Sequence, residues 1–292
     1  MLFIRRSCVF LCLLSFFIIY QPLFILAAQS TITESEGYAC MGSDKSRRQT
    51  EQQAMAEAKR NAVEKTLSYF KSETQVKDLQ LEKDVIGAYT NATISIIQEL
   101  DKVWYKDQSS GDCYRIKIKA EVTPDEKAMQ KITEGNNVVD HPAAPLHVQV
   151  WTGKKDYKQG EKIKVYLKGN KPFYARLLYK DAGSNLVQLL PNPFRKENYF
   201  NGGVIYELPS GNDKFDLEVS PPFGQEDIIL YTSTAPLGDL QLENKGDIYQ
   251  VKTEAKDIGI NTRGVKVSQS GNSKLKTAAE FFEEKAVVNT GR

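Results

Sequence analysis

The pattern of apolar and polar positions divides the chain into a first part with one long helix and a second part made of short strands. From Met55 to Phe70, apolar or small side chains recur every three or four positions, which is typical of one face of a helix. Ser46 and Gln49 form a capping box at its start. The alanine-rich stripe fits either a sheet or a partner helix, and we favour packing on a sheet of the same chain.

Two strands are expected after this helix. "ATISIIQELDKVWY" is rich in β-branched and aromatic residues, and "CYRIKIKAEV" alternates strictly between apolar and polar side chains. The order strand, helix, strand, strand predicts an α+β domain over residues 35–125, with the helix covering one face of the sheet. Residues 79–89 form a second, less regular segment.

The second part, residues 148–237, consists of short strands separated by turns. Strands are expected at 204–208, 214–219 and 227–233. In "YARLLYKDAGSNLVQLLPNPF" (174–194), two apolar runs flank a polar turn, which predicts a hairpin with Gly183 at a positive φ. Many short strands at intervals of about ten residues predict an all-β, sandwich-like domain.

The last 55 residues, 238–292, show a less clear pattern. "GVKVSQS" predicts a strand, and the stretch after Lys274 combines a short helix with a closing strand. We expect this C-terminal extension to pack on the all-β domain, with Glu283 and Glu284 as surface charges.

The first 28 residues predict a signal peptide. Arg5 and Arg6 precede an almost unbroken apolar run, and small residues follow at Ala27 and Ala28. The alternative is an uncleaved membrane anchor, because the run is close to the length that spans a bilayer. We favour cleavage and a periplasmic or secreted protein, with no membrane contact unless the segment is kept.

Export determines how the cysteines are interpreted. Cys8 and Cys12 would leave with the signal peptide, so Cys40 and Cys113 remain. Two thiols in an oxidising compartment favour a disulfide, although two independent buried thiols stay an alternative. Because Cys113 has the parity of the polar face, the bridge is expected at the edge or end of the sheet.

Charge and histidines restrict the function classes. The formal net charge is +2 and becomes zero without Arg5 and Arg6, so nucleic acid is not expected as a partner. His141 and His147 lie in a Pro- and Asn-rich stretch that we interpret as a linker, residues 126–147. No cysteine or acidic cluster accompanies them, so we predict neither a metal site nor a cofactor.

The first part resembles a known family. "GYAC" with the downstream "AKRNAVEK" and the closing "CYRIKIKAEVTP" is similar to the N-terminal domain of the periplasmic flagellar assembly protein T and to small exported lipoprotein domains. The resemblance covers most of residues 36–124 and implies an assembly or interaction module of the cell envelope. The rest of the chain departs from that flagellar protein.

The second part resembles an uncharacterised bacterial all-β domain, a domain of unknown function. The resemblance rests on "VWTGKKDYKQGEKIKVYL", "FYARLLYKDAGSNLVQLLPN" and "FDLEVSPPFGQEDIILYTSTAPL". It implies an accessory role beside other domains and transfers no catalytic residue.

The motifs of common catalytic sites are absent from the sequence, including G-x-S-x-G, the Walker loop and H-E-x-x-H. A hydrolase with paired carboxylates stays open, since carboxylate geometry cannot be read from sequence. We predict a non-enzymatic envelope protein that acts as an assembly, adaptor or accessory module and binds another envelope protein. The alternative is a sensor of a small ligand or glycan.

The candidate binding surface lies around the predicted hairpin. Pro191 and Asn192 form a rigid strand exit or the lining of a ligand groove, and we favour the rigid exit. Four aromatic residues nearby are candidates for an exposed patch, with a core position as the alternative. The full set of candidate residues is Tyr174, Pro191, Asn192, Phe194, Tyr199 and Phe200.

Overall fold

The computed structural model describes residues 28–73, 79–135, 138–264 and 278–292. The expected signal peptide, except for Ala28, lies outside the described residues, as does nearly all of the strand expected at 264–270. Within the described part of the chain, no helix is both long and apolar enough to cross a membrane.

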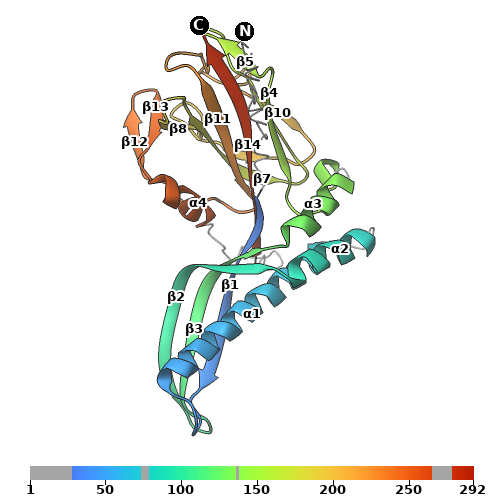
Figure 1. Cartoon of the computed structure of the whole chain (residues 1–292), viewed down its shortest axis with the longest axis vertical. Helices are drawn as coiled ribbons and strands as arrows, with labels where there is room; N and C mark the ends of the chain where they lie inside the picture. The colour runs from blue at the N-terminus through green and yellow to red at the C-terminus, as the bar shows by residue number, and fades with distance from the viewer. Residues whose placement is uncertain (1–27, 74–78, 136–137, 265–277) are drawn as a thin grey trace, which may run out of the picture.

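The N-terminal half contains, in chain order, β1 (Ala28–Cys40), α1 (Arg47–Glu73), α2 (Leu79–Thr90), β2 (Thr93–Asp107) and β3 (Gly111–Thr123). β3 lies between β1 and β2, and β2 is the outer edge of the sheet. α1 runs across one face of these strands (Figure 1). The less regular segment is a helix, α2, because its apolar residues recur at helical spacing and are buried where α2 packs on α1 and α3.

Helix α1 lies directly on strand β1. The predicted capping box is confirmed, since the Ser46 backbone N–H donates to Gln49 Oε1 at 2.8 Å and the Gln49 N–H donates to Ser46 Oγ at 3.3 Å. Ala54 and Ala58 are fully buried on the packed face. A Cβ at Gly37 of β1 would lie 2.1 Å from the Ala54 carbonyl oxygen and 2.3 Å from the Ala58 nitrogen. Small residues on both elements therefore set how closely helix and sheet approach.

The predicted disulfide joins Cys40 and Cys113, which face each other across β1 and β3 with their Cα atoms 3.9 Å apart. Cys113 is fully buried although it has the parity of the polar face. The bridge lies at the far end of the strand pair, where β1 ends, and closes the chain over 73 residues.

The C-terminal half is a β-rich, sandwich-like unit. One layer is the sheet ordered β10 (Ile205–Leu208), β6 (Val165–Gly169) and β4 (Val148–Thr152). The other layer is the part of the larger sheet ordered β8 (Leu186–Leu190), β7 (Phe173–Lys180), β11 (Gln225–Ser233) and β14 (Ala278–Gly291). Apolar residues from both layers form one core, which includes Val148, Leu167, Leu177 and Phe282.

The predicted hairpin is β7–β8, and its pairing is confirmed. Its turn differs from the prediction, because Ser184 rather than Gly183 has a positive φ, at 66°. Asp181 explains the turn: its carboxylate accepts from the Asn185 backbone N–H at 2.7 Å and from Asn185 Nδ2 at 2.8 Å. The strand predicted at 214–219 is wrong, since the described segment forms only an isolated bridge between Glu218 and Lys162.

The last strand connects the two halves. β14 (Ala278–Gly291) pairs with β11 along residues 281–289 and with β1 along residues 278–283. The short helix expected after Lys274 is not found in residues 278–291, which are all extended. One 11-stranded sheet therefore runs through both halves of the described chain, and Figure 1 shows β14 rising from the junction toward the C-terminus. Two short strands, β5 (Asp156–Lys158) and β9 (Tyr199–Phe200), extend this sheet.

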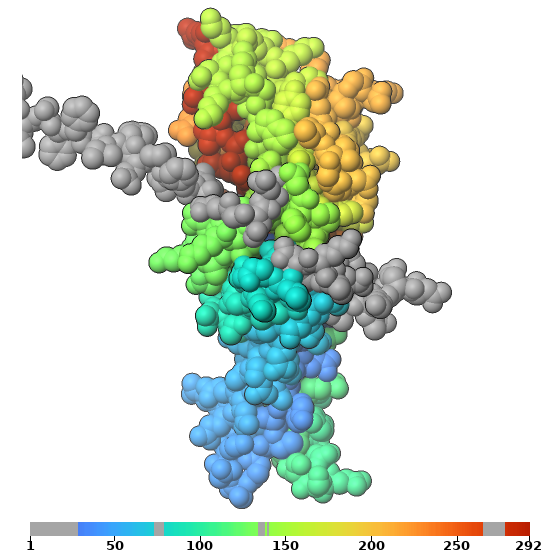
Figure 2. Space-filling view, turned by 90° about the vertical axis from the view of Figure 1, so that its right-hand side faces the viewer, coloured from blue at the N-terminus to red at the C-terminus, as the bar shows by residue number. Residues whose placement is uncertain are grey.

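Smaller elements cover the sheet and fill the junction. β12 (Leu242–Lys245) and β13 (Ile248–Val251) form a hairpin beside β8, followed by α4 (Ala255–Arg263). The segment interpreted as a linker contains α3 (Glu126–Gly135) and a 3-10 turn (Val138–Asp140). In the space-filling view the two halves are stacked along the long axis, with α2 and α3 near the junction (Figure 2).

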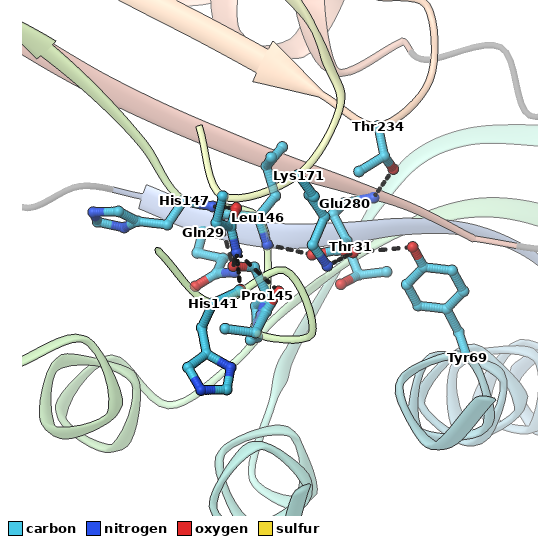
Figure 3. A network of polar contacts seen from close by, with 12 residues as sticks. Gln29, Thr31, Tyr69, His141, Pro145, Leu146, His147, Lys171, Thr234 and Glu280 are labelled. Atoms are coloured by element: carbon cyan, nitrogen blue, oxygen red, sulfur yellow. Dashed lines mark hydrogen bonds and ion pairs between the residues drawn. The ribbon is translucent and has the colours of Figure 1, made fainter. Parts of the chain in front are cut away.

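A buried polar network holds this junction together (Figure 3). Glu280 of β14 is fully buried, and its carboxylate is 2.8 Å from Lys171 Nζ and accepts from Tyr69 Oη at 3.0 Å. The Leu146 backbone N–H donates to the same carboxylate. Glu280 therefore contacts helix α1, the linker segment and the turn between β6 and β7 at once.

The two histidines of the linker segment lie at the edge of this network. Figure 3 shows the rings of His141 and His147 pointing in different directions. The His147 ring packs against Phe282, with centroids 4.8 Å apart, and burial lowers the pKa of His147 below its ordinary value. The His147 ring therefore belongs to the packed junction.

Candidate functional site

The structure separates the six candidate residues into four places. Phe200 is 1% exposed and stacks on Phe173 in the core, so it contributes nothing to an exposed surface. Tyr199 is 53% exposed and pairs with Tyr174 of the neighbouring strand, with ring centroids 4.9 Å apart. Pro191 is partly buried at the end of the hairpin.

The other two candidates, Asn192 and Phe194, line a groove on a different face of the sheet. Two cavities of about 270 and 260 Å³ adjoin here, and both are lined by Leu189, Leu217 and Ile248. We call the pair of cavities the β8 groove. It lies between strand β8 and the segment 214–222. Tyr179 lines this groove and Tyr174 lies on the opposite face of β7, because successive strand residues alternate.

Strand alternation explains the apolar floor of the β8 groove. Val187 and Leu189 project from β8 toward the same side as Tyr179 of β7 and Ile228 of β11. The opposite wall is held by backbone hydrogen bonds, among them Ile163 N–H to the Leu217 oxygen at 2.8 Å. The leucine, isoleucine and valine residues that line the groove are Ile163, Val187, Leu189, Leu217, Ile228 and Ile248.

Asn192 has a structural role in forming the rim. Its Oδ1 accepts from the backbone N–H groups of Phe194 at 2.9 Å and Arg195 at 2.8 Å, and its Nδ2 donates to the Leu189 oxygen at 2.8 Å. These bonds fix the turn that carries Phe194, which is 45% exposed. The Phe194 ring lies nearly parallel to that of Phe215, with centroids 6.3 Å apart. The turn therefore presents an aromatic pair beside the second cavity.

The lining of the groove is rich in carboxylates. Tyr179 Oη donates to the carboxylate of Glu226, which is 2% exposed. Burial, and next this hydrogen bond, raise the pKa of Tyr179 above its ordinary range, so its proton is kept at neutral pH. Asp216 lies 2.7 Å from Lys162 Nζ at the exposed rim. The five lining carboxylates are Asp181, Asp216, Glu218, Glu226 and Asp247, and Lys214 is the one basic residue among the lining residues described.

Two further features make the groove suitable for a ligand. Gln188, which also lines it, is 3% exposed, and its Oε1 has no hydrogen-bond partner in the described part of the chain. The β12–β13 hairpin borders the groove with Asp247 and Ile248, and it pairs with β8 at only two positions, Tyr249 and Gln250.

A separate cavity of about 640 Å³, apart from the β8 groove, lies between helix α1 and the edge strand β2. Trp104 forms part of it, with Nε1 3.2 Å from Glu51 Oε1 and the Arg47 guanidinium 4.7 Å from the ring centroid. Its charged lining residues are balanced, with two basic and two acidic side chains, Arg48, Lys102, Glu51 and Glu99. This balance gives no preference for a charged partner.

Sequence reasoning identified Asn192 and Phe194 but missed most of the groove. Asp216 and Glu218 were not among the candidate residues; both are exposed, and they border a cavity. Ile248 was not singled out because its contact with β8 bridges about 60 residues of sequence. The acidic runs "NDKFDLE" and "GQED" were the available signal.

Comparison with known proteins gives one match. A family model described as a domain of unknown function (DUF4384) matches residues 156–236. The β-rich half therefore carries a domain of unknown function, as the sequence resemblance implied, and this segment includes β7, β8 and the opposite wall of the β8 groove. Nothing in the comparisons shows the resemblance of the N-terminal half. No curated protein and no solved structure matches the chain.

Proposed function

We propose that this chain is an exported protein of the bacterial cell envelope that acts without catalysis, as an adaptor or accessory module that binds another protein. The β8 groove carries this proposal. It combines an apolar floor with a carboxylate rim and an aromatic pair of which Phe194 is exposed, which is the composition of a recognition surface. The disulfide supports an oxidising compartment and therefore export.

We also infer that the N-terminal half is an α+β module of the strand–helix–strand–strand type, as its sequence resemblance implies. The order β1, α1, β2 and β3 supports this, and α2 is an addition to it. Its connection to the β-rich half through β14 suits an adaptor, because both halves then present their surfaces in a constant orientation.

The proposal is tested by affinity purification of the full chain from the envelope of the producing cell, with captured partners identified by mass spectrometry. Ile248 is 45% exposed and lines both cavities, so I248R obstructs the groove from the surface. Ile260 of α4 is 54% exposed and does not line the groove, so I260R is the matched control. We expect wild type and I260R to capture the same partner and I248R to lose it.

Two outcomes contradict the proposal. Capture of the same partner by I248R with unchanged yield excludes the groove as the binding surface. Recovery of full-length protein among cytosolic contents after fractionation excludes the envelope role.

A second candidate function is a sensor of a small ligand or glycan. The parallel rings of Phe194 and Phe215 beside the second cavity favour it, because sugar rings stack on aromatic faces. Thermal-shift screening of the purified chain against mono- and disaccharides distinguishes this candidate: a stabilisation that F194A abolishes supports it.

A further inference from the structure

We propose that the β8 groove binds an extended segment of its partner in which lysine or arginine alternates with apolar side chains. This inference rests on the proposed function and specifies the chemistry of the partner. It follows from the charge, the shape and the polar groups of the groove.

The charge of the lining selects a cation. Five carboxylates and one lysine line the two cavities. Lys162 pairs with Asp216, and Tyr179 donates to Glu226. Asn185 donates two hydrogen bonds to Asp181, so three of the five carboxylates already have partners of their own. Glu218 and Asp247 are exposed at the rim and take part in no ion pair within the described residues. A basic side chain therefore finds a carboxylate at the rim of each cavity, whereas an acidic segment is repelled.

The shape of the groove favours a chain segment over a compact ligand. The two cavities share Leu189 and Ile248, so they adjoin along β8. Two adjoining cavities with apolar floors take alternate side chains, i and i+2, of one extended segment.

Strand β8 also leaves room for backbone contacts. β13 pairs with Val187 and Gln188 only, although β8 continues to Leu190. A segment in the groove lies alongside this part of β8, in the manner of β-strand addition.

The direct test uses three fluorescein-labelled peptides of twelve residues and the purified full chain. The first alternates lysine with valine, the second replaces lysine by glutamate, and the third replaces lysine by serine. Fluorescence anisotropy should show that the lysine peptide binds at least about tenfold more tightly than the other two, and that 0.5 M salt weakens it.

Charge-reversal variants identify the site. E218K/D247K replaces the two rim carboxylates with lysine and should lower the affinity for the lysine peptide at least about tenfold. E64K/E254K reverses two exposed carboxylates outside the groove and should leave its affinity unchanged. Far-UV circular dichroism and an unchanged unfolding midpoint show that both variants are folded.

The outcomes separate this inference from the proposed function. Equal binding of all three peptides, each weakened by I248R, overturns the cationic preference and leaves the groove as a binding surface. An equal loss of affinity for the lysine peptide in both charge-reversal variants shows that the groove is not the binding site. Competition by free spermidine as strong as that by the unlabelled lysine peptide shows that the groove takes a small cation, which also overturns the inference.

Discussion

At the scale of single residues, the prediction that Glu283 and Glu284 are surface charges is wrong. Both carboxylates are mostly buried, because β14 is an inner strand of the large sheet. Glu284 has the parity of Phe282 and Val288, which belong to the core, and its Oε2 has no hydrogen-bond partner among the described residues. Burial raises the pKa of Glu284 to about 7.

This carboxyl should make stability depend on pH. The folded state holds the proton more tightly than the unfolded chain, whose glutamate pKa is about 4.3. The folded state therefore binds more protons between about pH 4.5 and 7, and the free energy of unfolding falls as pH rises through that range. Measured by urea unfolding, the free energy of unfolding of wild type should fall by about 2 to 3 kcal/mol relative to that of E284Q between pH 5 and pH 8.

A matched control is Glu254, whose side chain is 71% exposed. E254Q should follow wild type at both pH values. A constant difference between wild type and E284Q would show that Glu284 does not titrate differently in the folded state.

At the scale of elements, the contact between α1 and β1 depends on the absence of side chains. The helix presents buried alanines, and Gly37 leaves no Cβ between the strand and the helix backbone. The helix, its start and its packed face all follow from local spacing in the sequence. The requirement for glycine at position 37 does not, because it arises from the Ala54 and Ala58 backbone about 20 residues away.

Gly37→Ala should therefore destabilise the protein by about 1–3 kcal/mol, because the new methyl group overlaps helix backbone that must move. Gly87 in α2 is exposed and has no atom within 4 Å of its added Cβ, so Gly87→Ala is the control. This control should stabilise by about 0.5–1 kcal/mol, since alanine favours helix over glycine. Urea midpoints measure both, and equal effects would rule out the close contact at Gly37.

At the scale of the whole molecule, β14 and the buried network connect the halves. β14 provides backbone pairing to β1 and β11, while Glu280 connects helix α1, the linker segment and Lys171. Lys171 is 9% exposed, so the pair is almost fully removed from solvent. Breaking such a pair leaves a buried charge, whereas replacing both partners with apolar groups removes the charges together.

E280A alone should lower the free energy of unfolding by about 3–5 kcal/mol. The double variant E280M/K171M should be closer to wild type than the sum of the two single variants, with a coupling energy of about 0.5–3 kcal/mol. A double-mutant cycle by urea unfolding measures this coupling. Strict additivity would show that Lys171 and Glu280 do not act as a pair.

The sequence by itself determined the elements whose pattern is local. These are the capped helix from Arg47, the alternating strand β3, the β7–β8 hairpin and the β-rich second half, and each follows from periodicity and turn residues within about 20 positions. The pairing of Cys40 with Cys113 was also inferred, from the number of cysteines in an exported chain.

The tertiary structure alone decided the features that join distant segments. β14 pairs with β1 across about 250 residues, and that pairing buries Glu280 and Glu284 and makes one sheet of two halves. The β8 groove likewise takes its walls from β7, β8, β11, β13 and the segment 214–222. Burial and cavity shape depend on which strands become neighbours, and side-chain periodicity within one strand carries no information about its neighbour's identity.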